Sequence, residues 1–379
     1  MVVETVGVEE EYLLVDPVSR RPSPVAQRVL DRARATGALP AHAELHPELV
    51  ATQIEAATSP CATTEDIRKE LETLRALLCR VALEEDARLV SVGHPVLFDK
   101  APPVMAGDRF ARITELYAES VRTYQACGCH VHVGTLDRES ALQVVNRLRP
   151  WLPTLLALSA NSAFDRGRDT SYDSWRIILQ SQFPGAGIPP HFRSVAHYED
   201  ELQRLIDAGM LVDADMTFWL ARPSRRFPTV EIRVADACAS VADTVLQAAL
   251  TRALVRRALV DVEAGREVPE FSDQSAAAAM WSAARHGLRG PAIDPIQGGR
   301  IPAMELLRRL LRHVRTQLDE CGDLPLVQDL VERTRRTGTG AARQREVAPS
   351  GPMAIVDMLI DLTAREEDVP QRFAHHGDG

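Results

Sequence analysis

Three consecutive glutamates stand inside an apolar run near the start of the chain, GVEEEYLLVD, whose composition is typical of a β-strand. Side chains alternate across a strand, so Glu9 and Glu11 share one face while Glu10 shares the other with Val8 and Tyr12. Two carboxylates side by side repel one another unless a cation or a proton lies between them. The run therefore predicts either an exposed strand edge or a strand whose acidic face meets bound cations.

Two further strand-like segments carry groups that could join the same site. ELVATQIEAAT places Glu55 in an apolar setting, and Glu48 lies at the start of this segment. CGCHVHVG places His130 and His132 on one face of a strand, with valines on the other face and glycines on both sides. Two imidazoles at this spacing can face a metal ion or a phosphate group, and glycines let a ligand approach the backbone. Taken alone, these residues could equally be surface glutamates and core histidines bonded to carbonyl groups.

The segment TVEIRVAD adds a fourth set, because Glu231 and Arg233 share a face inside a Val/Ile strand. The pair could neutralise itself, or the carboxylate could bind a metal ion while the guanidinium binds phosphate. An acidic residue or a histidine on one face of four separate strands is hard to explain as surface decoration. Carboxylates with imidazole suit Mg²⁺ or Mn²⁺, and the set lacks the thiolates of a structural zinc site. The sequence thus predicts that the glutamates face bound cations.

The composition excludes several other classes of protein. The chain has 379 residues and a net charge of −9, which argues against nucleic acid as the main partner. Its two lysines, Lys69 and Lys100, lie outside any GxxxxGK[ST] pattern, so phosphate groups would have to be met by arginine, backbone and metal ions. Since the chain has neither a long apolar stretch nor the basic start of a signal peptide, we expect no membrane contact and a cytoplasmic location.

Periodicity, helix caps and turn residues predict an α+β chain with antiparallel strands first and a helical cover last. Strands are expected at 3–16, 49–57, RLVSVGHP, CGCHVHVGTLD, MTFWLAR and TVEIRVAD. Helices are expected over 24–36, 63–87 (capped by Thr64), 108–126, 138–148, 150–163, 196–209, 239–264, 272–285, 302–320, 323–337 and 350–366. The segment from GRDTSYDSWR to PGAGIPPHF is expected to be a long functional loop, and AHHGDG a frayed end. We expect one catalytic domain over 1–379, strand-rich at about 1–238 and helical at about 239–379.

Six motifs together resemble one known family: GVEEEYLLVD, QIEAATSPC, CGCHVHVG, LSANSAFDRGRDTSYDSWR, FPTVEIRVADAC and GTGAARQR. They resemble the glutamate–cysteine ligase type 2, or carboxylate–amine ligase, family of the glutamine synthetase-like superfamily, across nearly the whole chain. The resemblance implies a glutamine synthetase-like curved, mainly antiparallel sheet with a helical cover and a helical C-terminal region. It also implies that the concave face of the sheet holds ATP and Mg²⁺ or Mn²⁺.

The resemblance implies a role for each candidate residue. The implied metal ligands are Glu9, Glu11, Glu48, Glu55, His130 and Glu231. His132 would approach the nucleotide phosphates, and Arg233 would face the transferring phosphoryl group, so that Arg233 and Glu55 take part in catalysis. Arg176 and Arg225 are candidates for binding a substrate carboxylate or phosphate, with a solvated surface role as the alternative. Arg345 in GTGAARQR could close over the site.

The implied reaction joins a carboxylic acid to an amine in two steps, through an acyl phosphate made at the expense of ATP. L-glutamate and L-cysteine are the expected substrates, in a chain that could form a homodimer. This sequence departs from the family pattern at Ala163 and Asp165 of ANSAFD and at LQSQFP, in the region expected to recognise substrate. A divalent-metal or nucleotide-binding homologue with altered chemistry and a metallohydrolase on the same fold are the alternatives.

Overall fold

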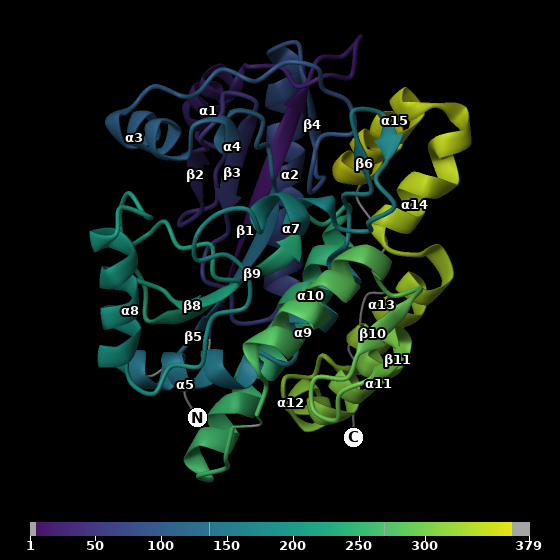
Figure 1. The fold of residues 1–379 in the computed structure, drawn as a ribbon. Helices are drawn as coiled ribbons and strands as arrows, with labels where there is room; N and C mark the ends of the chain where they lie inside the picture. The colour runs from purple at the N-terminus through teal and green to yellow at the C-terminus, as the bar shows by residue number, and fades with distance from the viewer. Residues whose placement is uncertain (1–4, 136, 269, 366–379) are drawn as a thin grey trace.

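The computed structural model describes residues 5–135, 137–268 and 270–365, and its centre is a seven-stranded sheet backed by helices (Figure 1). The strand order is β2–β3–β1–β5–β9–β8, and β4 pairs with the end of β1; all of these pairs are antiparallel. The strands are β1 (Val6–Val15), β2 (Glu44–Pro47), β3 (Gln53–Ala57), β4 (Arg88–Val90), β5 (Gly128–Gly134), β8 (Ala221–Pro223) and β9 (Thr229–Asp236). Two small hairpins lie outside this sheet, β6 (Phe164–Asp165) with β7 (Arg168–Asp169) and β10 (Pro291–Ile293) with β11 (Arg300–Pro302).

Helices make up most of the remaining regular structure. In the first half of the chain they are α1 (Ala26–Ala35), α2 (Thr64–Glu84), α3 (Asp108–Tyr117), α4 (Glu119–Arg122), α5 (Arg138–Leu148), α6 (Leu152–Ser159) and α7 (Trp175–Gln180). They continue as α8 (Val195–Asp207), α9 (Val241–Glu263), α10 (Asp273–His286), α11 (Ala303–His313), α12 (Arg315–Glu320), α13 (Leu324–Thr337), α14 (Gly340–Val347) and α15 (Pro352–Ala364). The fold is α+β, as the sequence predicts.

The register of the sheet brings the four predicted segments side by side. Glu11 on β1 stands opposite Glu55 on β3, and Glu9 stands opposite His130 on β5. On the next strand pair, His132 on β5 stands opposite Glu231 on β9. Directly opposite residues of antiparallel strands project to the same side of a sheet, so these side chains share one face.

The other face of the sheet packs on helices. Val8 on β1, Val131 on β5 and Ile232 on β9 belong to one buried core with leucines and valines of α5, α6 and α9. The long helix α9 is buried on nearly all sides, since it lies between the sheet and the outer helices α12 and α13. Burial of these apolar side chains on one face fixes which way the alternate acidic residues point.

Helix α2 follows the predicted amphipathic pattern with a different cap. Its buried stripe includes Leu71, Leu74 and Leu78, as expected from the sequence. The prediction that Thr64 caps the helix is wrong, because the Thr63 side chain accepts the hydrogen bond from the Asp66 backbone N–H in a capping box. Thr64 is instead buried and donates its hydroxyl to Asp323 at 2.7 Å.

Several predicted boundaries are corrected by the structure. The strand expected over 49–57 is shortened to β3, because a turn at 51–52 separates β3 from β2, which lies before the expected range. The strand expected at MTFWLAR is reduced to β8. The expected long loop contains helix α7, the helix expected over 302–320 breaks at Val314, and GTGAARQR forms most of α14. Local propensity does not reveal these boundaries because tertiary contacts decide them. The expected frayed end AHHGDG lies outside the described residues.

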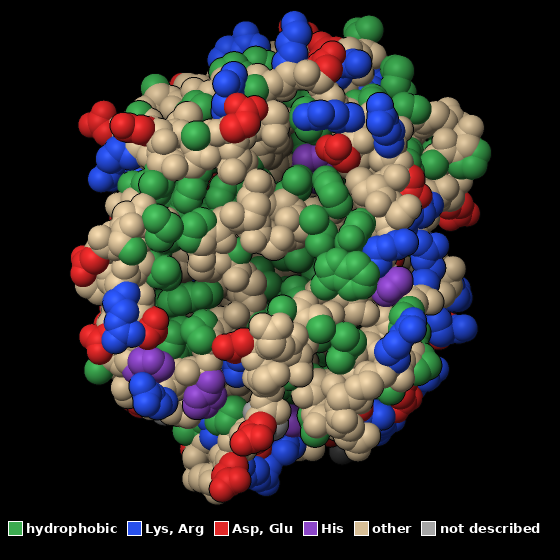
Figure 2. Space-filling model, viewed as in Figure 1, with side chains coloured by type: hydrophobic (Ala, Val, Ile, Leu, Met, Phe, Trp, Pro, Cys, Tyr) green, Lys and Arg blue, Asp and Glu red, His purple; other side chains and the backbone are tan. Residues whose placement is uncertain are grey.

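The face seen in Figure 1 has an uneven distribution of side chains. Figure 2 shows that hydrophobic side chains gather in the middle of this face, between α8 and α10, while charged side chains gather along its rim. Within the described ranges, no helix combines the length and apolar character needed to cross a membrane.

Candidate active site

One face of the central sheet gathers carboxylates and imidazoles into a continuous cluster. Ligand-type atoms lie within 4.8 Å of one another in three groups, Glu9–His132–Glu231, Glu9–Glu55–His130 and Glu11–Glu48–Glu55. The first two groups share Glu9 and the last two share Glu55, so they form one row across β9, β5, β1 and β3. The structure thus brings together all six residues expected as ligands, and it places His132 among them.

Glu9 is the centre of this cluster. Its Oε2 lies 3.1 Å from His130 Nδ1, and its Oε1 lies 3.1 Å from His132 Nε2. The other ring nitrogen of His132 lies 3.1 Å from the Thr229 hydroxyl, which fixes the orientation of the imidazole. An imidazole held through one nitrogen presents the other to its partner in a defined direction, as metal-binding histidines do.

Glu11 occupies the far side of the same cluster. Its Oε2 accepts a hydrogen bond from the Gly128 backbone N–H at 2.5 Å, and its Oε1 lies 3.5 Å from His130 Nε2. Glu48 completes this side from the short segment after β2, within the group that also includes Glu55. Three carboxylates therefore converge here with His130 beside them.

Two arginines hold Glu231 at the other side of the cluster. Arg222 on β8 donates from Nε to Glu231 Oε2 at 2.7 Å, and Arg233 pairs with Glu231 Oε1. Arg233 also approaches His130, with its Nη1 3.4 Å from Nδ1. Burial opposes ionisation of Glu231, but Arg222 and Arg233 hold the pKa of its carboxyl well below the usual range. Sequence reasoning missed Arg222, which only the pairing of β8 with β9 brings opposite Glu231.

The cluster holds more negative charge than its cations balance at the Glu48–Glu55 side. Burial raises the pKa of Glu55 well above its usual range, and the neighbouring carboxylates of Glu9, Glu48 and Glu11 raise it further. For the same two reasons, burial and then Glu11, the pKa of Glu48 rises to about 8. Arg233 lowers both values but does not offset the crowding. Acids in such surroundings are stabilised in their charged form by a nearby cation.

At the centre of the cluster, unlike the Glu48–Glu55 side, two imidazoles offset the negative charge of Glu9. Burial raises the pKa of Glu9, but hydrogen bonds and charge from His130 and His132 outweigh it and hold this pKa well below its usual range. Burial and then Arg233 lower the pKa of His130. Burial also lowers the pKa of His132, but Glu9 outweighs it and the net shift is upward. His130 is thus favoured as the neutral imidazole that binds metal ions.

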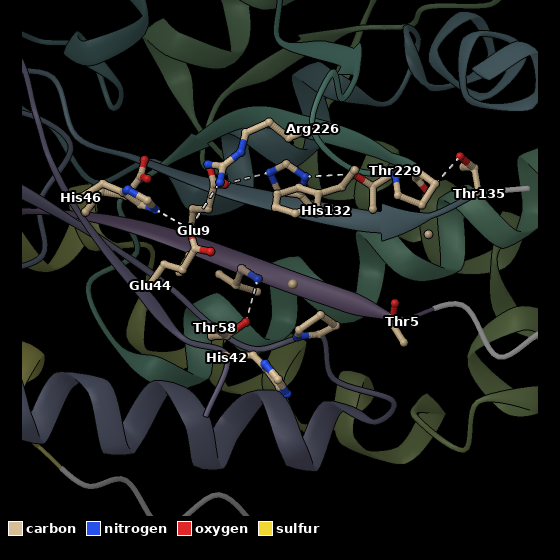
Figure 3. Close-up of a pocket in the computed structure, with 18 of the residues that line it drawn as sticks. Thr5, Glu9, His42, Glu44, His46, Thr58, His132, Thr135, Arg226 and Thr229 are labelled. Carbon is tan, nitrogen blue, oxygen red and sulfur yellow. Dashed lines mark hydrogen bonds and ion pairs between the residues drawn. The ribbon is translucent and has the colours of Figure 1, made fainter. Parts of the chain in front are cut away.

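A cavity of about 750 Å³ opens beside this cluster (Figure 3). Figure 3 shows that Glu9 and His132 line this cavity from neighbouring strands, with His46 and Glu44 to one side of them and Thr229 and Thr135 to the other.

The hairpin between β8 and β9 forms part of the cavity wall. Arg226 lies over the ring of Phe227 at 5.2 Å and 3.7 Å from Glu44 on β2. Both hairpin residues line the cavity, and the Phe227 ring is half exposed. They were not singled out from the sequence, because they lie in the connection PSRRFP between the expected strands MTFWLAR and TVEIRVAD.

The two arginines expected to bind substrate lie in different surroundings. Arg176 on α7 is buried, and its guanidinium donates to the carbonyls of Arg233 at 3.2 Å and Val234 at 3.4 Å. Arg225 is 40% exposed and lies 3.4 Å from Asp215 and 3.8 Å from Glu199. Of these two arginines, Arg176 is the one whose guanidinium contacts β9, one of the four strands that carry the cluster.

Arg345 of GTGAARQR points to the segment before α7. It donates to Asp169 at 2.8 Å and to the Tyr172 carbonyl at 2.7 Å, and it pairs with Asp173. The contacts of Arg345 thus hold the segment that leads into α7.

Comparison with known proteins identifies the family. The sequence profile described as glutamate–cysteine ligase family 2 matches residues 5–355. The chain belongs to this family. A protein of Saccharopolyspora erythraea, provisionally named glutamate–cysteine ligase 2-2, is 52% identical over 362 residues, which cover 95% of this chain and 92% of that protein. A protein of Mycobacterium sp. strain KMS with the same provisional name is 43% identical, over 95% of this chain and 98% of its own.

Solved structures of the ligase fold resemble this one despite low identity. The glutamate–cysteine ligase of Francisella tularensis in complex with AMP has a TM-score of 0.68 at 12% identity, over 97% of this chain and 90% of that chain. The Pup ligase PafA in complex with Pup has a TM-score of 0.52 at 16% identity, over 92% of this chain and 68% of that chain. These matches agree with a glutamine synthetase-like fold for a member of the glutamate–cysteine ligase family 2.

The donor set of the cluster fits Mg²⁺ or Mn²⁺. Its ligand-type atoms are carboxylate oxygens and imidazole nitrogens, and no thiol takes part in the three groups. Hard divalent cations prefer such oxygen-rich sets, whereas structural zinc sites use thiolates. The uncompensated charge around Glu48 and Glu55 is of the sign that such cations would offset.

Proposed function

We propose that this family member is an ATP- and Mg²⁺-dependent carboxylate–amine ligase. The observation that carries the proposal is the single row of Glu9, Glu11, Glu55, His130 and Glu231 beside a 750 Å³ cavity. Such an acid-rich row needs cations to neutralise it, and nucleoside triphosphates bind to proteins together with Mg²⁺. The cavity has the size of small-molecule sites, which are typically several hundred Å³.

The three carboxylate–imidazole groups are the residues that would hold divalent cations. When bound, such cations would neutralise phosphate oxygens and orient them for transfer. The cavity beside Glu9 and His132 is where we propose that the nucleotide binds. The exposed ring of Phe227 could stack on the base of the nucleotide, and the guanidinium of Arg226 could pair with the phosphates of the nucleotide.

Arg233 is the residue of this chain that we propose to act during phosphoryl transfer. Its guanidinium lies between Glu231 and His130, so it is fixed at the cluster and remains charged. A fixed cation at the transferring group stabilises the charge that develops there without reorganising. Arg222 supports this arrangement, because it shares Glu231 and leaves Arg233 to face the cluster.

The proposed reaction has two steps. A carboxylate oxygen of the acid attacks the γ-phosphorus of ATP, and the bond to the β–γ bridging oxygen breaks to give an acyl phosphate and ADP. The amine nitrogen then attacks the acyl carbon, the bond to the phosphate oxygen breaks, and the amine loses a proton. The products are an amide, ADP and inorganic phosphate. Positioning and charge neutralisation carry most of such chemistry, which is what this site supplies.

L-glutamate and L-cysteine are the substrates that we propose to test first. Names of the relatives support this choice, while the departures at Ala163, Asp165 and LQSQFP argue for a wider panel of acids and amines. The decisive experiment is an ADP-release screen with Mg²⁺ and ATP, crossing glutamate and related acids against amines. Release that needs both an acid and an amine supports the ligase. Turnover without ATP would favour a metallohydrolase, and binding without turnover would favour a homologue with altered chemistry.

We also propose that residues 1–379 act as one catalytic domain in the cytoplasm and that the chain forms a homodimer. Sedimentation of the purified protein tests the second statement, with a mass near twice 41.8 kDa expected. A mass near that of one chain would contradict it.

A further inference from the structure

Asp236 ends the strand β9, and its carboxylate is a fully buried acceptor that the reaction outlined above does not use. Its Oδ2 accepts hydrogen bonds from the Ser162 hydroxyl at 2.7 Å and from the Asn161 backbone N–H at 2.9 Å. Its Oδ1 accepts one from the Ser174 hydroxyl at 2.8 Å. One side chain of the active-site strand thus holds both ends of the segment 161–174.

This segment leads directly to Arg176. Ser174 is the N-cap of α7 and accepts from the Ile177 N–H, while Ser162 accepts from the Arg176 N–H at 3.1 Å. The Arg176 guanidinium itself lies 3.8 Å from Asp236 Oδ1. Backbone and side chain of Arg176 are therefore both fixed, directly or through a serine, by Asp236.

Two glycines show how tightly this arrangement is packed. A Cβ on Gly93 would lie 2.8 Å from Asp236 Cγ, so any larger residue there would displace the carboxylate. A Cβ on Gly128 would lie 2.5 Å from Arg176 Nη2 and 3.0 Å from His130 Nε2. The missing side chain at Gly128 lets the guanidinium reach the cluster, beside the backbone N–H that binds Glu11.

The opposite side of the segment is held by α14. Gln344 donates to the Asn161 carbonyl at 2.9 Å and accepts from the Ala163 N–H at 3.1 Å. Arg345 adds its contacts with Asp169, Asp173 and the Tyr172 carbonyl. The segment is thus held between β9 and α14, and Asp236 is the part of this arrangement that belongs to the active-site strand.

We propose that Asp236 is a positioning residue that fixes Arg176 for recognition of the substrate acid. The proposal rests on the proposed function and on the expectation from the sequence that Arg176 binds a substrate carboxylate. Without the Asp236 carboxylate, the start of α7 loses its acceptor on β9, and among the described residues the Arg176 guanidinium keeps only its bonds to the Arg233 and Val234 carbonyls. Affinity for the acid should then fall, while the nucleotide end of the site, at Glu9, His132 and Thr229, should change little.

The test is Asp236→Asn, compared with Asp323→Asn as a matched control. An amide has one acceptor oxygen, so it cannot accept from both the Ser174 hydroxyl and the Asn161 N–H, and it carries no charge to pair with Arg176. Asp323 is a buried aspartate with the same kinds of partner, Arg252 and the Thr64 hydroxyl, away from the cluster. The control therefore reports the general effect of removing a buried charge.

Steady-state ADP release with Mg²⁺, L-glutamate and L-cysteine gives the first readout. For Asp236→Asn we expect the KM for L-glutamate to rise at least tenfold and the KM for ATP to change less than threefold. Ser174→Ala, which removes one donor, should raise the KM for L-glutamate about threefold and serves as the kinetic variant if Asp236→Asn does not fold. Unchanged KM values, or equal changes of both KM values matching those of Asp323→Asn, would overturn the proposal.

Hydrogen exchange of the backbone gives a second readout that needs no turnover. In Asp236→Asn, or in Ser174→Ala if the former does not fold, peptides within 161–176 should exchange at least tenfold faster than in the native protein, while peptides of α9 should not. Exchange in 161–176 that stays native would overturn the positioning role even if the native protein is active. If the native protein releases no ADP with any acid, the ligase proposal fails, and faster exchange in 161–176 still supports the anchoring by Asp236.

Discussion

Neighbouring glutamates of one strand have opposite surroundings in this molecule. On the helix-covered face of β1, Glu10 is fully buried and meets Arg75 of α2, with Oε1 2.6 Å from Nη2 and Oε2 3.0 Å from Nε. On the other face, Glu9 and Glu11 meet further carboxylates and two imidazoles. The first face pairs each charge, and the second leaves negative charge in excess.

The contrast teaches that charge balance, rather than burial, distinguishes the acidic face from the helix-covered face. Burial raises the pKa of Glu10, but Arg75 and the Thr244 hydroxyl lower it below its usual value. Arg75 also donates to the carbonyls of Cys238 and Ala239 after β9, so it joins the two strands across the back of β5. Among the described residues, Arg233 lowers the pKa values of Glu48 and Glu55, but not enough to bring either back to its usual value.

The largest expected effect is on the paired face. Arg75→Met leaves the Glu10 carboxylate buried without its partner, and we expect the free energy of unfolding to fall by about 3–5 kcal/mol. Urea denaturation followed by circular dichroism measures it. The double variant Glu10→Gln/Arg75→Met should recover much of this loss, because no unpaired charge remains. A loss below about 1 kcal/mol in the single variant would show that the pair is not what balances this face.

On the acidic face, the expected effect is on catalysis instead. Glu55→Gln removes a proposed metal ligand, so kcat should fall about a hundredfold or more, which corresponds to roughly 2.7 kcal/mol. Without metal, Glu55→Gln should be at least as stable as the native protein, because glutamine removes the cost of holding the Glu55 carboxyl among neighbouring acids. Both are measured on the same sample, by ADP release and by thermal unfolding. Full activity in Glu55→Gln would contradict its role as a ligand.

Mg²⁺ should act on the acidic face of the sheet and not on the face where Glu10 pairs with Arg75. Mg²⁺ at about a hundred times its dissociation constant should stabilise the native protein by roughly 2.7 kcal/mol, and EDTA should remove the effect. His130→Ala should fold but lose most of this stabilisation, because one group of ligands is incomplete. Glu10→Gln should be less stable than the native protein yet keep the full response to Mg²⁺. Thermal unfolding with and without Mg²⁺ measures this stabilisation in each variant. Full stabilisation of His130→Ala by Mg²⁺ would contradict the assignment of His130 as a metal ligand.

The smallest expected effect is at Arg225. Its exposed pairs with Asp215 and Glu199 are of the kind that contributes under about 1 kcal/mol. Arg225→Ala should therefore change stability by no more than about 0.5 kcal/mol and the KM for the acid about twofold at most. Kinetics with L-glutamate measures this. The exposure of Arg225 argues against a role in substrate binding. A tenfold rise in the KM for L-glutamate would contradict this interpretation.

Alternation along strands allowed much of this site to be anticipated from the sequence. The expectation that Glu9 and Glu11 share one face and Glu10 the other is confirmed by the register of β1 with β3 and β5. The hydrophobic pattern is enough to predict this arrangement, because burial of alternate apolar side chains on one face makes the residues between them point to the other face. The same reasoning holds for His130 and His132 on β5.

Partners that depend on tertiary docking could not be predicted. Arg75 belongs to an ordinary amphipathic helix, and only the packing of α2 behind β1 brings its guanidinium to Glu10. Arg222 stands opposite Glu231 through the pairing of a strand only three residues long. Helix α14 was missed because GTGAARQR begins with turn residues, although Thr339 caps it and Gln344 anchors it to Asn161.

The central claim is that the acidic face of the sheet binds divalent cations. Anomalous diffraction from crystals grown with Mn²⁺ and ATP tests it most directly. We expect manganese peaks within the row formed by the three groups, with the Glu9–Glu55–His130 group among those occupied. Peaks found only elsewhere on the molecule, or none at a Mn²⁺ concentration that supports ADP release, would contradict the claim.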